Sequence, residues 1–222
     1  MTVKSTTFSE IYLVENKLAT ENLTPGKSVY GETLVKVGKK EYRIWDPNRS
    51  KPAAAIKKKL KVFPLKKNDI VLYLGVGSGT TCSHFSDIIG PNGLIYGIDV
   101  ADKPLIDLIS LAEARRNIVP ILADCRKIEE YEDLVVDDVD FVYEDIADPQ
   151  QIEIFIRNCE NFLKDNGHGC IAIKSQSIDA IKKPQEVYRE CIKKLEEHFT
   201  IIDKVELDPF QKFHLFLVLK KK

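Results

Sequence analysis

The sequence has almost no net charge, no closely spaced cysteine pair and no long apolar run, and each absence excludes a class of protein. Its 33 Lys and Arg nearly balance 34 Asp and Glu, whereas a protein that binds nucleic acid alone is usually more basic. The five cysteines show no C-x-x-C spacing, which argues against zinc and favours reduced intracellular thiols. No apolar run approaches the roughly 18 residues of a membrane span, and residues 1–5 do not open an apolar signal core. We therefore expect a cytoplasmic protein.

The chain is long enough for one large domain, or for one domain with a smaller one. Residues 1–45 contain short alternating runs separated by Glu15-Asn16, Pro25-Gly26 and Gly38-Lys39-Lys40, which is typical of small β-hairpins. We therefore predict a β-rich subdomain over residues 1–45 and a main domain over residues 46–222. The alternative is that these strands merely extend the edge of the main sheet.

The main domain is organised around an apolar run, residues 70–76, that ends in a glycine-rich turn before a helical pattern. Glycines allow the backbone to turn sharply and to approach a ligand. Hydroxyls and free N–H groups at a helix start suit a carboxylate or a phosphate. The candidate ligand contacts of this stretch are Gly75, Gly77, Gly79, Thr80 and Thr81. By itself the pattern fits NAD, FAD or S-adenosylmethionine.

From residue 70 onward, predicted strands and helices alternate until the last two strands. Strands are predicted over residues 70–76, 94–98, 119–122, 139–143 and 170–173, and helices over residues 80–89, 103–115, 149–163 and 184–198. Strands 200–206 and 214–219 have no helix between them, so they must pair antiparallel. This predicts an α/β fold of the class I S-adenosylmethionine-dependent methyltransferase type, with a Rossmann-like seven-stranded sheet and an antiparallel terminal hairpin.

Ligands of open α/β sheets bind beyond the carboxyl ends of the strands, so the residues at those ends are candidates for a cofactor site. Asp99 follows the second strand of the main sheet and is well placed to accept both ribose hydroxyls of an adenosine. Asp124 and Cys125 follow the third strand and are placed to meet an adenine edge.

Three further residues at this edge are candidates for catalysis. Asp145 follows the fourth strand and Lys174 ends the fifth. Because the last strand runs antiparallel, its first residue, His214, starts at the edge where Lys174 ends. We expect the remaining histidines, His84, His168 and His198, to be structural.

A lysine-rich segment follows a turn at residues 46–52, where we predict a short helix with Ser50 or Lys51 near its cap and Pro52 in its first turn. A lysine run is most often a solvated helix face. This is nevertheless the densest basic patch of the chain and its best candidate for phosphate contact; it comprises Lys57, Lys58, Lys59, Lys61, Lys66 and Lys67.

Taken together, these motifs closely resemble fibrillarin, the RNA 2′-O-methyltransferase family of box C/D ribonucleoproteins, in its archaeal form. The resemblance rests on residues 42–51, 73–75, 78–81, 144–147, 173–175, 177–179 and 208–210, and on His214. It implies a catalytic set of Lys51, Asp145, Lys174 and His214. It also implies cofactor contacts at Thr80, Thr81, Asp99, Val100, Asp124, Cys125, Asp145, Ile146, Ala147 and Asp148.

The resemblance further implies methyl transfer from S-adenosyl-L-methionine to a ribose 2′-hydroxyl of rRNA or tRNA. The implied partners are a Nop5-type scaffold, an L7Ae-type kink-turn protein, a box C/D guide RNA and its target. Gly77, Asp148 and Phe213 depart from the family pattern, which usually has alanine, glutamine and aspartate there. No Gly/Arg-rich tail signals nucleolar targeting.

A lysine beside another cation holds its proton less tightly, so we predict that Lys174 accepts the hydroxyl proton, with Asp145 orienting it. Lys51 and His214 would hold or polarise the hydroxyl.

An NAD-dependent oxidoreductase would need a pair such as Tyr-x-x-x-Lys, yet Ile192 stands four residues after Tyr188. A second alternative is a non-catalytic assembly subunit that keeps only cofactor binding.

Overall fold

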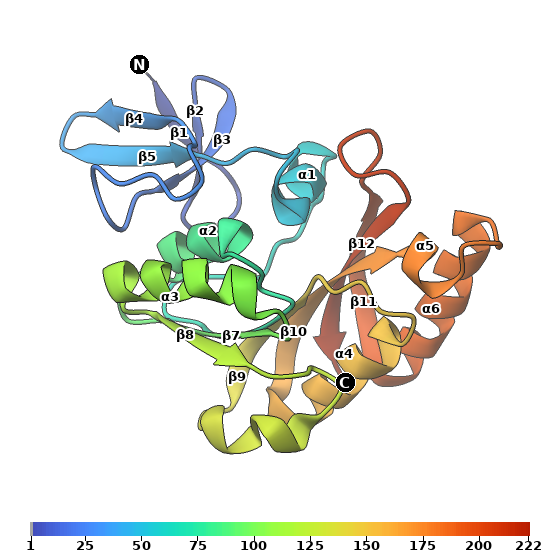
Figure 1. Ribbon diagram of the computed structural model, residues 1–222. Coiled ribbons are helices and arrows are strands. Elements are labelled where there is room, and N and C mark those ends of the chain that lie inside the picture. Colours follow the sequence, from blue (N-terminus) through green and yellow to red (C-terminus); the bar gives the residue numbers. More distant parts are fainter. Residues whose placement is uncertain (1) are drawn as a thin grey trace.

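The computed structural model describes residues 2–222, and within them the strands form two separate sheets (Figure 1). The N-terminal sheet is antiparallel, in the order β1-β2-β3-β5-β4. Its strands are β1 (Val3–Ser5), β2 (Ile11–Val14), β3 (Lys17–Glu21), β4 (Leu34–Val37) and β5 (Lys40–Ile44). The predicted hairpins therefore form a sheet of their own and do not extend the main one. Strand β1 was not predicted, because three residues are too few to show alternation.

The main sheet has the order β11-β12-β10-β9-β6-β7-β8 and matches the predicted methyltransferase fold. Its strands are β6 (Ile70–Leu74), β7 (Leu94–Asp99), β8 (Ile118–Leu122), β9 (Val139–Glu144), β10 (Leu163–Lys174), β11 (Phe199–Glu206) and β12 (His214–Lys221). Strands β6 to β10 pair parallel, and β12 pairs antiparallel with both β10 and β11. The prediction of a terminal antiparallel hairpin is confirmed.

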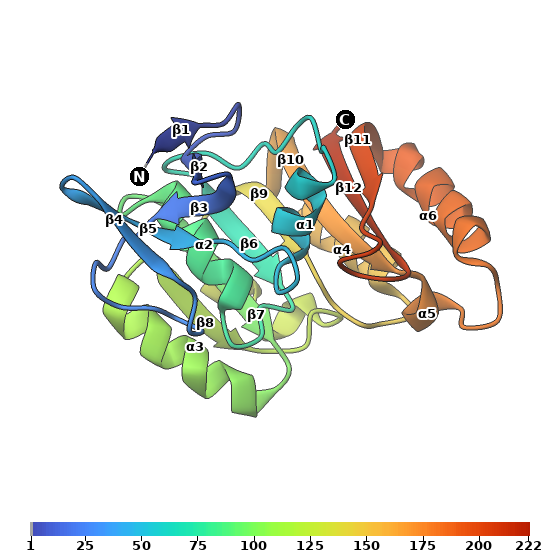
Figure 2. The ribbon, with the colours of Figure 1, turned by 90° about the horizontal axis from the view of Figure 1, so that it is seen from above.

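Helices cover both faces of the main sheet (Figures 1 and 2). They are α1 (Lys51–Lys57), α2 (Thr80–Ile89), α3 (Asp102–Arg115), α4 (Gln151–Phe162), α5 (Ser175–Ile178) and α6 (Pro184–His198), with short 3₁₀ turns η1 (Ile128–Glu130) and η2 (Glu132–Leu134). Alternate side chains of a strand point to opposite faces. On β6, Val71 and Tyr73 join the core under α1, α2 and α3, while Leu72 and Leu74 join the core under α4 and α6. Within residues 2–222, none of the helices combines the length and apolar character that a membrane crossing requires.

The boundary between α4 and β10 differs from the prediction. We expected the helix to reach residue 163 and the next strand to begin at residue 170, but α4 ends at Phe162 and β10 already begins at Leu163. The Asp-Asn-Gly segment at residues 165–167 is a turn signal, and here it forms a register irregularity inside the strand, between Leu163 and His168. A Cβ on Gly167 would lie 2.6 Å from the Leu163 side chain. The chain therefore folds tightly on itself here, yet Leu163 still pairs with Val139 at the start of β9.

The two sheets share one hydrophobic core. Ile11 and Leu18 of the N-terminal sheet, together with Trp45, pack in the same cluster as Phe85 of α2 and Leu108 of α3. The division into a subdomain over residues 1–45 and a domain over residues 46–222 therefore stays a prediction.

A buried polar cluster also joins the sheets, centred on Asp87 of α2. The Asp87 carboxylate accepts hydrogen bonds from the Thr20 hydroxyl (2.7 Å), the Leu23 backbone N–H (3.0 Å), Arg43 (2.8 Å) and Arg115 (2.6 Å). Both ion pairs have fully buried side chains. Buried charges need such partners, because leaving one unpaired is costly.

His84, one turn before Asp87, extends this cluster. Since the Thr20 hydroxyl donates to Asp87, the His84 Nδ1–H donates to Thr20 Oγ1 (2.8 Å), and His84 Nε2 accepts from the Tyr30 hydroxyl (2.7 Å). The ring stacks on Trp45 at 5.0 Å. Burial, with the nearby charges of Arg43 and Arg115, lowers the pKa of His84 well below its ordinary value. His84 is therefore a neutral structural residue, as predicted.

Candidate active site

Four predicted residues meet at the carboxyl edge of the main sheet. Lys51 Nζ lies 2.8 Å from Asp145 Oδ2, and Lys174 Nζ lies 2.9 Å from Asp145 Oδ1. Lys174 also donates to the Asp145 backbone carbonyl at 3.2 Å. His214 is the register partner of Lys174 in the β10–β12 pair. One carboxylate thus lies between two ammonium groups, and the three charged side chains are 13–18% exposed.

Lys51 reaches this edge because α1 begins there. Ser50 precedes the helix in an extended conformation, and Pro52 occupies its first turn, where a missing N–H costs nothing. The buried side chains of residues 53–55 are all alanine, so α1 packs against β12. The Ser50 hydroxyl accepts a hydrogen bond from Thr81 Oγ1 (3.0 Å), which ties the start of α1 to the start of α2.

A backbone carbonyl group orients the His214 ring. Its Nδ1 lies 2.7 Å from the Lys212 carbonyl oxygen, which can only accept, so Nδ1 carries the proton and Nε2 keeps its lone pair. Burial lowers the pKa of His214, with a contribution from Lys51 and Lys174, so the ring is neutral at pH 7. The Lys212 carbonyl therefore orients the His214 ring, although Phe213 stands where the resemblance implies an aspartate.

A cavity of about 330 Å³ adjoins these residues. It is lined by Gly75, Asp99, Val100, Asp124, Cys125, Arg126, Asp145, Ile146, Ala147, Asp148, Ile154 and Lys174. Nine of these were predicted as cofactor contacts, and Asp145 and Lys174 belong to both the cavity and the four-residue set. Two lining residues were not predicted: Arg126, which directly follows Cys125, and Ile154 of α4.

The lining of this cavity fits the adenosine part of a nucleoside cofactor. Asp99 holds the glycine turn, because its Oδ2 accepts from the Gly77 N–H (2.7 Å) and its Oδ1 from the Ala101 N–H (2.9 Å). Each oxygen keeps a second lone pair for a ribose hydroxyl. Gly75 lies so close to the end of β9 that a Cβ would stand 2.7 Å from the Ile146 side chain. A glycine is required there.

Arg126 connects two acidic residues of the cavity. Its guanidinium donates to both carboxylate oxygens of Asp124, at 2.8–3.1 Å, and lies 3.7 Å from Asp148 Oδ2. The Arg126 hydrogen bonds lower the pKa of Asp124, which keeps this carboxylate charged. Where the family usually has glutamine, Asp148 therefore takes part in an ion pair.

Two buried side chains, neither of them predicted as part of the site, hold the backbone at Cys125 in place. The Cys125 carbonyl accepts hydrogen bonds from the Tyr131 hydroxyl (3.3 Å) and from Asn158 Nδ2 (3.2 Å). On the same side of the sheet, Glu144 is 1% exposed, and its carboxyl oxygens have no hydrogen-bond partner in the part of the chain that the structure describes. Burial raises the pKa of Glu144 well above its ordinary value.

Gly77, Gly79, Thr80 and Thr81 lie outside the lining of this cavity. Gly79 has a φ of +91°, and a Cβ on it would lie 2.7 Å from Leu111, so it permits the packing of α2 against α3. Thr81 is buried against Ser50, and Thr80 lines a separate groove. Their direct contact with a ligand stays a prediction.

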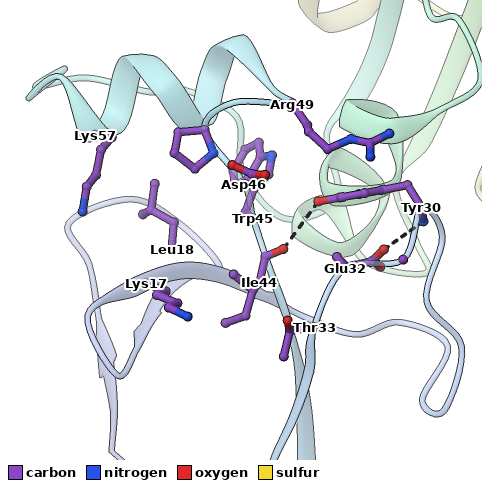
Figure 3. A pocket seen from close by; sticks show the side chains of 12 residues that line it. Lys17, Leu18, Tyr30, Glu32, Thr33, Ile44, Trp45, Asp46, Arg49 and Lys57 are labelled. Atoms are coloured by element: carbon purple, nitrogen blue, oxygen red, sulfur yellow. Dashed lines mark hydrogen bonds between the residues drawn. The ribbon is translucent and has the colours of Figure 1, made fainter. Parts of the chain in front are cut away.

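A larger cavity, of about 500 Å³, lies between the N-terminal sheet and α1 (Figure 3). Its acidic groups are already engaged: Glu32 accepts from the Tyr30 N–H (2.8 Å) and from Arg43, and Asp46 accepts from the Asn48 N–H (2.8 Å). Arg49 lies 5.0 Å from the centre of the Tyr30 ring. Because none of these groups forms a set like that around Asp145, we place the chemistry at the sheet edge.

Comparison with known proteins gives a consistent result. The family model described as Fibrillarin matches residues 2–222. A Thermococcus sibiricus protein described as "Fibrillarin-like rRNA/tRNA 2′-O-methyltransferase" is 50% identical over the whole of both chains.

Two solved structures have the same fold. Aeropyrum pernix fibrillarin, in complex with natively bound S-adenosyl-L-methionine, has a TM-score of 0.90 and 44% identity, and the alignment covers 99% of this chain and 98% of that one. The fibrillarin chain of a fibrillarin/Nop5p complex has a TM-score of 0.88 and 39% identity, covering 96% and 98%.

Proposed function

The chain belongs to the fibrillarin family, and on that premise we propose that it transfers the methyl group of S-adenosyl-L-methionine to ribose 2′-hydroxyls of rRNA and tRNA. The observation that carries this proposal is the placement of Asp145 between Lys51 and Lys174, at the mouth of a cavity lined by Asp99 and Asp124. Asp145 and Lys174 line the cavity and also belong to the four-residue set, so a cofactor in the cavity would lie next to the hydroxyl that it methylates.

The cofactor would occupy the 330 Å³ cavity. Asp99 would accept hydrogen bonds from its ribose hydroxyls, and Asp124 and Cys125 would meet its adenine edge. When bound, the cofactor supplies a methyl group that its sulfonium already makes electrophilic. The protein therefore has to align the ribose oxygen and manage its proton.

The four-residue set can do both. Lys174 accepts the proton, and the Asp145 carboxylate holds Lys174 and Lys51 in place. The neutral His214 holds the ribose beside Lys174 and leaves the O–H bond directed toward the Lys174 amine. Lys174 has to be a neutral amine to accept the proton. Once it has become an ammonium, two ammonium groups on one carboxylate leave one excess positive charge, which stabilises negative charge developing on the oxygen.

A relative crystallised with Nop5p supports a Nop5-type scaffold as a partner of this chain. We extend this to an L7Ae-type kink-turn protein, a box C/D guide RNA and its paired target. A net charge of −1 agrees with an enzyme that partners hold on RNA. The lysines that follow α1, from Lys57 to Lys67, remain our candidates for contact with RNA phosphates.

The test is methylation of a guide-paired target by the particle reconstituted from this chain, the scaffold, the kink-turn protein and the guide RNA. We expect labelled methyl groups at the guide-specified ribose and no turnover by the chain alone at physiological salt. Cofactor binding without any transfer would instead identify a non-catalytic assembly subunit. Calorimetry with S-adenosyl-L-methionine and with NAD shows which cofactor binds, and so distinguishes the methyltransferase and the non-catalytic subunit from an NAD-dependent oxidoreductase.

A further inference from the structure

The loop between β11 and β12 ends in an aromatic residue that faces solvent. Phe213 is 51% exposed, which makes it the most exposed aromatic residue among residues 2–222. Phe210, three residues earlier in the same loop, packs against the core under α1. The loop therefore has room to bury one phenylalanine and leaves the other at the surface.

The backbone of Phe213 is held in place although its conformation is unfavourable. Its φ of +62° lies in the left-handed region, which a bulky side chain rarely adopts. Its carbonyl accepts hydrogen bonds from the N–H and the hydroxyl of Ser175, both at 3.1 Å. Gln211 donates to the Asn48 carbonyl (2.9 Å), so the loop is anchored to the turn before α1 as well. Figure 2 shows the loop beside α1.

The position of Phe213 connects it with the proposed chemistry. It directly precedes His214, and its carbonyl is bound by the residue that follows Lys174. Lys212 is exposed beside it. An aromatic face among cationic side chains is the usual composition of a surface that binds a nucleoside.

We propose, on the basis of the proposed function, that Phe213 is a contact for the target RNA strand. Its ring packs on the nucleoside that carries or adjoins the reacting 2′-hydroxyl and so helps to hold the target strand beside His214. A scaffold protein seated on Phe213 would cover the place where the ribose must enter, so the RNA is the favoured occupant. Phe213 is therefore a binding residue for the target strand.

Its test compares Phe213→Ala, Phe213→Gly and Phe213→Tyr with the wild type in the reconstituted particle at saturating S-adenosyl-L-methionine. Phe213→Gly removes the ring and suits a positive φ, so its folding is not at risk. We expect both truncations to raise KM for target RNA about 10-fold, as the loss of an aromatic contact of this kind would do, with kcat and the KM for cofactor nearly unchanged. Phe213→Tyr keeps the ring and should behave as the wild type.

The matched control is Val136→Ala, because Val136 is 77% exposed and lies before β9, at the opposite edge of the sheet. A target with an abasic reacting nucleotide distinguishes packing on the base from packing on the sugar. If the effect of Phe213→Ala persists there, the ring packs on the sugar; if it disappears, the ring packs on the base.

Two results would overturn the inference while leaving the proposed function intact. In one, wild-type particles transfer methyl groups and the truncations match Val136→Ala. In the other, the truncations weaken binding of the scaffold at unchanged KM for RNA, which identifies Phe213 as a protein contact. A wild-type particle that transfers nothing would overturn both proposals.

Discussion

Asp87 lies between Arg43 and Arg115, and Asp145 lies between Lys51 and Lys174, so one chain holds the same formal charges at two sites. The separations are similar, at 2.8 and 2.6 Å around Asp87 and 2.8 and 2.9 Å around Asp145. The surroundings differ. The side chains around Asp87 are fully buried, whereas those around Asp145 are 13–18% exposed at the edge of a cavity.

The type of cation and its access to solvent separate the two roles. A guanidinium does not lose its proton in proteins, and its planar fork bonds several acceptors at once. Arg43 accordingly bonds Asp87, Glu32 and Ser83 and joins the two sheets. A lysine has a single nitrogen that can exchange a proton, and Lys174 faces the cavity. Charge pairing alone therefore does not distinguish a structural site from a reactive one.

Lys174→Arg tests this difference most directly. It keeps the positive charge beside Asp145 but removes the nitrogen that can accept a proton. Methyl transfer should fall by about 10²- to 10⁴-fold, the usual contribution of acid–base catalysis, measured by single turnover in the reconstituted particle. Lys182→Arg, at an exposed ion pair with Glu190, is the control and should keep the wild-type rate. A near-normal rate for Lys174→Arg would contradict the assignment of Lys174 as base.

Asp87→Asn addresses the structural side of the comparison. Removing this charge leaves two buried guanidinium groups without their shared partner, so the free energy of unfolding should fall by about 3–5 kcal/mol. Urea unfolding followed by circular dichroism measures it. The control is Asp107→Asn on the exposed face of α3, expected to change stability by no more than about 0.5 kcal/mol. A similar small loss for Asp87→Asn would show that the cluster does not hold the sheets together.

Glu144 gives a third acidic site, one without a cation. Its pKa is raised in the folded chain, so the folded state keeps the proton while the unfolded state loses it above about pH 4.5. Wild-type stability should therefore fall as pH rises, by up to about 1.4 kcal/mol per pH unit. Glu144→Gln does not titrate, so its stability relative to the wild type should increase between pH 5 and pH 8.

Thermal unfolding of Glu144→Gln and the wild type at several pH values measures this effect. Glu113→Gln on the exposed part of α3 is the control and should show no such trend. A pH-independent difference between Glu144→Gln and the wild type would mean that Glu144 is ionised in the folded chain.

Asp145→Asn should have the smallest effect on stability. Lys51 and Lys174 are both partly exposed and can turn toward water, so the loss should be about 1 kcal/mol, near that of surface pairs. Chemical unfolding of Asp145→Asn beside Asp87→Asn provides the comparison. A loss as large as that of Asp87→Asn would show that the candidate active site is also a structural support.

Much of the candidate site could be predicted from the sequence, because all strands of a parallel sheet end at the same edge. The residues that end or follow β7, β8, β9 and β10, from Asp99 to Lys174, could be assigned to this edge in order, and the antiparallel last strand added His214. The link from Lys51 to these residues came from the family resemblance, since a lysine at a helix start has no local signal for catalysis.

Other features could not be predicted locally. Gly79 has the sequence context of a ligand contact, but its missing Cβ makes room for Leu108 and Leu111 of α3. Arg43, Asp87 and Arg115 are far apart in the sequence and show no common pattern, so their cluster exists only after the two sheets pack. The start of β10 was predicted at residue 170 but lies at Leu163, because pairing of Leu163 with Val139 overrides the turn signal at residues 165–167.

Local patterning and chain direction specify the alternation of strands and helices, the closing hairpin and the edge at which polar side chains gather, so these features could be predicted from the residues alone. Tertiary structure decided which acidic residue is structural and which faces a cavity, and that the Lys212 carbonyl orients His214. Burial and pairing between distant segments set those properties, and neither is encoded in neighbouring residues.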